Sequence, residues 1–214
     1  MKRVLGIDCG SVITGYGVID TDGRACRMVT WGVIIARTGD AFPDRLKKIS
    51  DKLSEIIQTY SPHDVAVEDI FYSVNAKSAL KLGQVRGVAL LKAADAGLPV
   101  HEYAPLLVKS SVVGYGRAEK SQVQQMVKLM LGLDELPPED AADALAVAIC
   151  HANHSGALGR LQQAVAKEKS GKRSEGLLAE ARQSIKGKAP VRRTAASRLR
   201  KGEAIDALRR PTVG

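Results

Sequence analysis

Four acidic residues are spaced so that a sheet-and-helix fold would bring their side chains together. Asp8 and Glu68 each end a short apolar run, and Asp140 and Asp143 lie three residues apart at the start of a predicted helix. Carboxylate oxygens suit hard cations such as Mg2+ or Mn2+, and clustered acids are costly unless a cation neutralises them. The pattern therefore predicts a divalent-metal site able to hydrolyse a phosphodiester.

The two acids on the predicted helix have a second interpretation. Acidic residues in a first helical turn favour the helix dipole and cap free amides without any catalytic role. The small residues Ala144 and Ala148 favour the first interpretation, because a small-residue face docks closely on a sheet and turns Asp143 inward.

Apolar spacing predicts an α/β fold that positions these acids. Strands are expected at 4–8, 15–19, 26–35, 65–68 and 98–102, and helices at 46–60, at 75–96, from 119 and from 136. The strands that end in Asp8 and Glu68 are expected to be central and parallel. Their carboxyl ends would then share the sheet edge at which open α/β sheets bind ligands.

The formal net charge of +9 is unevenly distributed along the 214 residues. Residues 155–214 hold 15 Lys+Arg against 5 Asp+Glu, whereas residues 1–154 carry a net charge of −1. Residues 71–128 hold 8 basic and 3 acidic side chains, and residues 129–154 hold 5 acidic and no basic ones. This polarity suits a nuclease that binds a polyanion beside a cation site, although solvated helix faces of differing sign give the same counts.

We expect one core-forming domain over residues 1–154 and a basic, flexible extension over residues 155–214. The extension contains no run able to build a second core, and we expect it to stay disordered or to become helical on DNA. The three cysteines are odd in number and far apart, which argues against a disulfide framework. The sequence shows neither a signal peptide nor an apolar run of about 18 residues, so we expect a cytoplasmic chain without a membrane partner.

Small residues recur every four positions at Ala79, Gly83 and Gly87. A glycine costs an exposed helix about 1 kcal/mol relative to alanine, so this stripe predicts a packed contact. From the pattern alone, the partner of the stripe is either the core of the domain, which is slightly favoured, or a second subunit.

The histidines are not expected to bind metal. His151 and His154 lie three residues apart on a helix and imitate a zinc-binding pair, but such pairs usually come with further ligands. We therefore reject that site and expect His63 and His101 at the surface or at a strand edge.

Several segments together resemble the RuvC-type Holliday-junction resolvases of the ribonuclease H-like superfamily. They are LGIDCGS at 5–11, TGYGV at 14–18, VEDIF at 67–71, NAKSALKLGQ at 75–84 with Arg86 and Gly87, AEKSQV at 118–123 and DAADALA at 140–146. The resemblance covers about residues 1–154 and implies a mixed five-stranded sheet flanked by helices. One departure is Cys9, where the family usually has proline, and it places a thiol beside the predicted metal site.

The resemblance implies an endonuclease that resolves four-way DNA junctions by paired, symmetric nicks in recombination and repair. Asp8, Glu68, Asp140 and Asp143 would bind two Mg2+ ions per subunit, with Mn2+ as a substitute, and the products would carry 5′-phosphate and 3′-hydroxyl ends. Family members are homodimers, so the resemblance favours a role for the Ala79, Gly83 and Gly87 stripe in the dimer contact or in its support. Family members also work with the RuvA and RuvB branch-migration proteins.

The resemblance also implies roles for basic and aromatic residues. Lys109 and Lys120 align with lysines that the family needs near the scissile phosphate, while each alone is equally a solvated surface lysine. Further residues are expected to contact DNA. They are Lys77, Lys81 and Arg86 along the backbone, Phe71 stacked on an unpaired base, and Tyr72 as a weaker candidate for the same role.

Two other classes of function remain open from the residues. The segment GIDCGS at 6–11 also resembles the phosphate loop of actin- and sugar-kinase-like ATPases, but we find no second such segment for the other half of their site. A junction-binding protein without catalysis would be expected if an acid were replaced, and all four are present.

Overall fold

Five strands with alternating side chains form one mixed sheet in the computed structural model, which describes residues 1–69 and 76–157. The strand order is β3-β2-β1-β4-β5. The first three strands are antiparallel neighbours, and β4 and β5 continue the sheet parallel to β1. The strands are β1 (Lys2–Asp8), β2 (Ile13–Thr21), β3 (Cys26–Ile35), β4 (Asp64–Glu68) and β5 (Val100–Tyr103).

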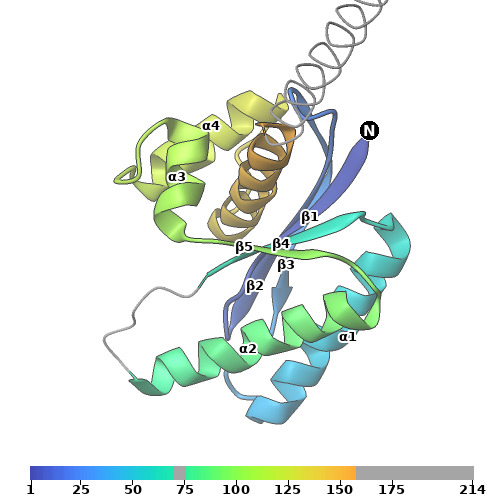
Figure 1. Cartoon of the computed structure of the whole chain (residues 1–214). Coiled ribbons are helices and arrows are strands. Elements are labelled where there is room, and N and C mark those ends of the chain that lie inside the picture. Colours follow the sequence, from blue (N-terminus) through green and yellow to red (C-terminus); the bar gives the residue numbers. More distant parts are fainter. Residues whose placement is uncertain (70–75, 158–214) are drawn as a thin grey trace, which may run out of the picture. The chain divides into compact units, whose positions relative to one another are not determined.

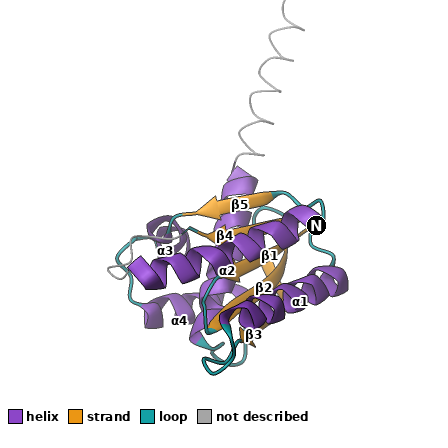
Figure 2. Ribbon diagram, turned by 90° about the horizontal axis from the view of Figure 1, so that it is seen from below, coloured by secondary structure: helices purple, strands orange, loops and turns teal. Residues whose placement is uncertain are grey.

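Helices cover both faces of this sheet, as Figures 1 and 2 show. One face carries α1 (Phe42–Tyr60) and α2 (Ala76–Asp95), which also pack on each other. The other face carries α3 (Pro105–Val113), α4 (Lys120–Leu131) and a last helix over residues 139–157, drawn in orange in Figure 1. The expected mixed five-stranded sheet flanked by helices is confirmed.

The alternation of strand side chains divides the interior into two cores. On β1, Val4 packs with the last helix, whereas Leu5 and Ile7 pack with α1 and α2. Strand β4 alternates in the same way. Ala66 packs in the core under the last helix, and Val65 and Val67 pack in the core under α1 and α2. Asp8 and Glu68 follow in the same alternation as Val4 and Ala66, so their side chains belong to the face covered by the last helix.

Glycines let the last helix lie directly on β1 and β2. A side chain on Gly6 would collide with the backbone of Ala144 and Ala148, and one on Gly17 would collide with Leu145. Residues 144–152 of this helix are all buried. A helix that touches strand backbone in this way has little freedom to slide, so its first turn is held at a fixed place over the sheet.

Helix α3 was missing from the predicted order of elements. Its sequence, PLLVKSSVV, buries Val108 and Val112 while Leu106 and Leu107 stay exposed, so apolar type and burial do not coincide. Proline at its first position and Gly114 in the left-handed region at its end are the signals that were available. Strand β5 begins two residues later and ends one residue later than expected.

The predicted boundary after residue 154 falls inside the last helix, whose described part includes residues 155–157. The rest of the predicted extension lies outside the described residues. Among the helices that are described, none combines the length and the apolar character needed to cross a bilayer.

Candidate active site

Three elements bring the four predicted acids to one end of the sheet. Ile7 on β1 pairs with Val67 on β4, so Asp8 and Glu68 follow as the next residues of two adjacent parallel strands. Asp8 also pairs across the sheet with Gly15 on β2. The backbone carbonyl of Asp140 lies against Gly15, and Asp143 follows one helical turn later.

Electrostatics shows that the acids act on one another. Burial, and then the charges of Glu68, Asp143 and Asp140, raise the pKa of Asp8 to about 7. Burial and the charge of Asp143 likewise raise the pKa of Glu68 to about 7. The pKa of Asp143 is also raised, mainly by burial, although Lys120 partly offsets this. Negative charge therefore accumulates here beyond what the protein's own cations neutralise.

The four carboxylates do not form a tight cage for a single ion. Within residues 1–69 and 76–157, no three of them bring ligand oxygens within 4.8 Å of one another. Mutual repulsion between buried carboxylates favours such spacing when no cation lies between them.

Two lysines border the acids. The ammonium of Lys120, the first residue of α4, lies 3.4 Å from Asp143 Oδ2 and also pairs with Glu139. Lys109 donates a hydrogen bond of 2.9 Å to the carbonyl of Ala118, and its charge lowers the pKa of Glu68 in part. Both lysines named from the sequence thus lie beside the acids. The pairing of Lys120 with Glu139 was not predicted from the sequence, and the position of Glu139 next to Asp140 was the one available signal for it.

Cys9 is buried and does not add a thiolate to the site. Burial, followed by the charge of Asp8, raises the pKa of the Cys9 thiol to about 12, so the thiol stays protonated at neutral pH. A protonated thiol is a poor metal ligand. The departure from the usual proline therefore leaves the oxygen character of the site unchanged.

The remaining predicted DNA contacts have varied surroundings. Arg86 pairs with Glu102 and lies 3.2 Å from Asp69 Oδ1, and its side chain is only 16% exposed. The ammonium of Lys81 lies 5.6 Å from the centre of the Phe42 ring, and Lys77 is exposed. Phe71 and Tyr72 lie outside the described residues. The assignment of all five to DNA binding stays a prediction.

The small-residue stripe of α2 faces away from the core. A side chain on Gly83 or Gly87 would meet no atom within 4 Å, whereas Val85, Ala89 and Ala93 form the buried face of this helix. The slight preference for a core contact was therefore wrong. Leu80 and Leu91, also on the outer side, are 70% and 56% exposed.

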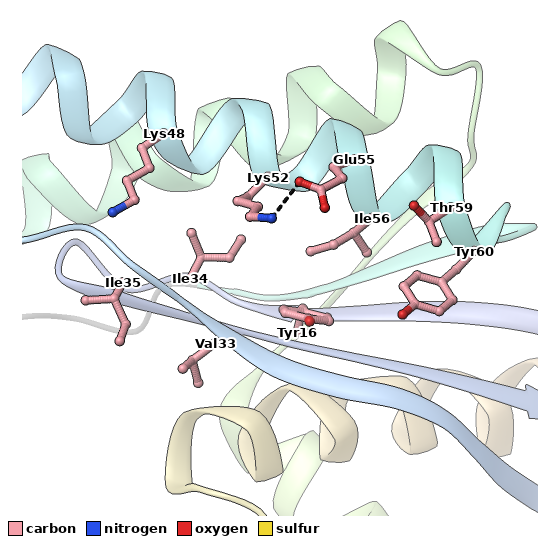
Figure 3. Close-up of a pocket in the computed structure, with 10 residues that line it drawn as sticks. All are labelled: Tyr16, Val33, Ile34, Ile35, Lys48, Lys52, Glu55, Ile56, Thr59 and Tyr60. Carbon is pink, nitrogen blue, oxygen red and sulfur yellow. Dashed lines mark hydrogen bonds and ion pairs between the residues drawn. The ribbon is translucent and has the colours of Figure 1, made fainter.

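A hollow of about 310 Å3 lies between α1 and strands β2 and β3, away from the acids (Figure 3). Its charged residues include Lys52 and Glu55, which pair with each other at 2.6 Å. We do not assign it as the active site, because it opens on the α1 face of the sheet. Its lining consists of Tyr16, Val33, Ile34, Ile35, Lys48, Lys52, Glu55, Ile56, Thr59 and Tyr60.

The histidines are arranged differently from the sequence-based expectation. His101 is indeed on a strand and partly exposed, and His63 is exposed. His151, however, is buried beside His101 and Asp64, and ligand atoms of these three residues lie within 4.8 Å of one another. Sequence spacing missed this cluster because its members come from three separate elements.

Comparisons with known proteins agree with this architecture. The chain is 57% identical over 153 residues to the crossover junction endodeoxyribonuclease RuvC of Citrifermentans bemidjiense, covering 72% of this chain and 93% of that protein. The corresponding protein of Koribacter versatilis is 53% identical over 161 residues, covering 74% of this chain and 97% of the relative.

Solved structures give the same result. Thermus thermophilus RuvC in complex with a Holliday junction substrate superposes with a TM-score of 0.70 at 35% identity, covering 73% of this chain and 96% of that one. The yeast mitochondrial resolvase Ydc2, at 15% identity and a TM-score of 0.52, shares the fold and covers 71% of this chain and 79% of its own.

The family model for the crossover junction endodeoxyribonuclease RuvC matches residues 4–151, which include all four acids and both lysines. The resemblance read from the sequence motifs is thereby confirmed. The chain belongs to the RuvC family of crossover junction endodeoxyribonucleases.

Proposed function

We propose that this protein is a nuclease that resolves four-way DNA junctions by cutting two opposed strands symmetrically. The observation that carries the proposal is the mutual electrostatic effect of Asp8, Glu68, Asp140 and Asp143 at one end of the sheet. Membership of the RuvC family supports the choice of substrate, since a relative of the same family has been solved with a Holliday junction.

The residues of this site fit divalent cations. Two carboxyl groups with pKa values of about 7 and a third with a raised pKa are poorly neutralised by Lys120 and Lys109 alone. Two Mg2+ ions, or Mn2+ in their place, would be held by these acids. When bound, they supply the positive charge that activates a water and stabilises the departing 3′ oxygen. We expect products with 5′-phosphate and 3′-hydroxyl ends.

The chain's own residues would position the scissile phosphate. Asp8 and Glu68 are fixed at the ends of two adjacent strands, and Asp143 is fixed by a helix that rests on strand glycines. Lys120 extends from the start of α4 to Asp143, where its ammonium would also offset negative charge that develops on the phosphate. Lys109 would add further positive charge, because its charge also partly lowers the pKa of Glu68.

Paired nicking requires two active sites, so we propose a homodimer formed through α2. The exposed side of this helix presents Leu80, Gly83, Gly87 and Leu91, where glycines allow close approach of a second helix. An isologous contact of this kind would place two equal sites about a two-fold axis, which matches the approximate symmetry of a four-way junction.

Further contacts of the same activity are proposed from charge. Lys77, Lys81 and Arg86 would hold DNA backbone, and Phe71 with Tyr72 would contact bases at the crossover. The basic extension would strengthen nonspecific DNA binding and steepen its dependence on salt. Cytoplasmic location and delivery of the junction by RuvA and RuvB belong to the same proposal.

The test uses the full-length chain with a synthetic four-way junction and a linear duplex of the same sequence, each with and without Mg2+. We expect paired nicks in the junction only, and only with Mg2+, with ligatable ends. Equal cutting of the duplex would contradict junction selectivity. Cutting that persists with EDTA would contradict the role given to the acids.

A further inference from the structure

A second polar cluster lies at the other end of the sheet, on the same face as the acids. Asp64 is the first residue of β4, and Glu68 is its last. Glu68 lies four steps along the strand from Asp64, a distance of about 13 Å. His101 pairs with Ala66 across β4 and β5, and His151 comes from the last helix. These three residues therefore join two strands and a helix at a place that the nuclease site does not use.

The ligand atoms of the cluster converge. His151 Nε2 lies 3.3 Å from Asp64 Oδ2, and His101 Nε2 lies 3.7 Å from Asp64 Oδ1. Tetrahedral zinc, with bonds of about 2.0–2.1 Å to nitrogen and oxygen, holds its ligand atoms about 3.3 Å apart. The two imidazole rings lie side by side, with their centres separated by 4.3 Å. Only a small adjustment would bring the three atoms around one ion.

The hydrogen bonds around His151 support ligation through Nε2. The other ring nitrogen, Nδ1, is hydrogen-bonded to the hydroxyl of Tyr103 at 2.8 Å. Such an outer bond fixes the orientation of a metal-binding imidazole. Burial, followed by the charge of His101, lowers the pKa of His151.

Lys2 is the competitor for this position. Its ammonium lies 2.6 Å from Asp64 Oδ2, while Asp64 itself is 3% exposed. Burial raises the pKa of Asp64, but hydrogen bonds from Lys2 and His151 outweigh it, and the net pKa is lowered. The Lys2 side chain is 51% exposed, so it is free to swing into solvent when a divalent cation takes its place.

We propose that Asp64, His101 and His151 form a binding site for a transition-metal ion of the zinc type, separate from the acids that serve catalysis. Two imidazoles and one carboxylate, with a water as fourth ligand, select zinc-like ions over Mg2+, which prefers oxygen alone. The ion ties β4 and β5 to the helix whose first turn carries Asp140 and Asp143. Its role is to stabilise that framework.

The competing interpretation is a hydrogen-bonded network closed by Lys2 alone. In that case Lys2 supplies the only positive charge that Asp64 needs, and zinc would find no site. The two interpretations differ in the effect of Lys2→Met. A metal site should bind zinc more tightly once its competitor is removed, whereas a closed network should lose stability and gain no affinity.

The experiment measures Zn2+ binding to the full-length chain by equilibrium dialysis, in excess Mg2+ so that the acids are occupied. We expect one Zn2+ per chain in the wild type and in Asp8→Asn. Replacing the half-exposed ligand in His101→Gln should weaken binding by more than about tenfold, because a ligand contributes at least as much as an outer-shell partner. Lys2→Met should tighten it.

Two controls and a second measurement keep the test decisive. His63→Gln and His154→Gln remove imidazoles outside the cluster and should leave Zn2+ affinity unchanged. Zn2+ should also raise the melting temperature of wild type but not of His101→Gln. Unchanged affinity in His101→Gln, or loss of binding in His154→Gln, would overturn the site. Neither readout depends on nuclease activity, so the result is independent of the proposed function.

Discussion

The backbone carbonyl of Asp140 lies against the Cα of Gly15, in the space that a side chain at position 15 would occupy. Gly15 is also the cross-strand partner of Asp8. One residue without a side chain thus sets the distance between the strand that carries one acid and the helix that carries two others. The position of the two helix acids over the sheet therefore depends on this backbone contact.

Gly15→Ala should displace the start of the last helix. The added methyl group has no room, so we expect a loss of about 1–3 kcal/mol in the free energy of unfolding and a larger fall in nicking than the stability loss explains. Urea unfolding and single-turnover cleavage would measure the two effects. Gly39→Ala, where a side chain meets nothing within 4 Å, is the matched control and should behave like wild type.

The stability of the metal-free protein should depend on pH through the acids. Asp8 and Glu68 have folded pKa values of about 7, above the ordinary values of 3.8 and 4.5 for these side chains. The folded state therefore binds more protons than the unfolded state between about pH 4 and 7, and the stability contributed by these groups is lost as pH rises through 7.

Asp8→Asn isolates this effect because asparagine does not titrate. Above pH 7 without metal, the variant should be more stable than wild type by a few kcal/mol, and the gap should close near pH 4. Saturating Mg2+ should also close it by stabilising wild type. Thermal unfolding across pH measures both, and a wild type that is more stable than the variant at pH 8 without metal would refute the shared charge.

Lys120→Ala should separate cation binding from catalysis. Removing its ammonium from beside Asp143 leaves the site more negative, so the Mg2+ concentration for half-maximal activity should fall. The maximal nicking rate should fall by about 100-fold, because a fixed positive charge near the phosphate is lost. Lys128→Ala, which removes a lysine bonded to the carbonyl of Asp134, should change neither value. A lower Mg2+ concentration for half-maximal activity with an unchanged maximal nicking rate would contradict the role of Lys120 near the phosphate.

Leu80→Glu should weaken the proposed dimer. Leu80 is 70% exposed on the outer side of α2, and a carboxylate buried in a contact between subunits is costly. Sedimentation should show a shift towards monomer, and junction nicks should become unpaired. Leu129→Glu is closely matched, because Leu129 on α4 is 73% exposed, and it should leave the oligomeric state unchanged. An equal effect of both changes would point away from α2.

The elements that the sequence predicted best are those with periodic burial. Strand β1 alternates between two cores, and α1 buries Ile49, Leu53, Ile56 and Ile57 at helical spacing, so pattern and structure agree. The prediction missed helix α3 because its leucines are exposed and its valines are buried. Residue type alone does not distinguish the two.

The site was predictable where a motif marks the end of a strand or the start of a helix. Asp8, Glu68, Asp140 and Asp143 lie in such positions. The parallel pairing of β1 with β4 brings the first two together, and the packing of the last helix on strand glycines adds the other two. Whether the α2 glycines face the core or the surface could be decided only from the structure, since a small residue suits the core and a subunit contact equally. The cluster of His151 with Asp64 and His101 depends on tertiary contacts alone, and no local spacing signals it.

The most direct test compares Asp8→Asn and Asp143→Asn with wild type for both cleavage and binding of one labelled four-way junction in Mg2+. Asp51→Asn, which neutralises an exposed acid of α1 on the other face of the sheet, is the control for charge. We predict that both site variants bind the junction as tightly as wild type or more tightly and lose nicking by at least about 1,000-fold, while Asp51→Asn keeps full activity. Nicking at the wild-type rate by either site variant would contradict the assignment of these acids to catalysis.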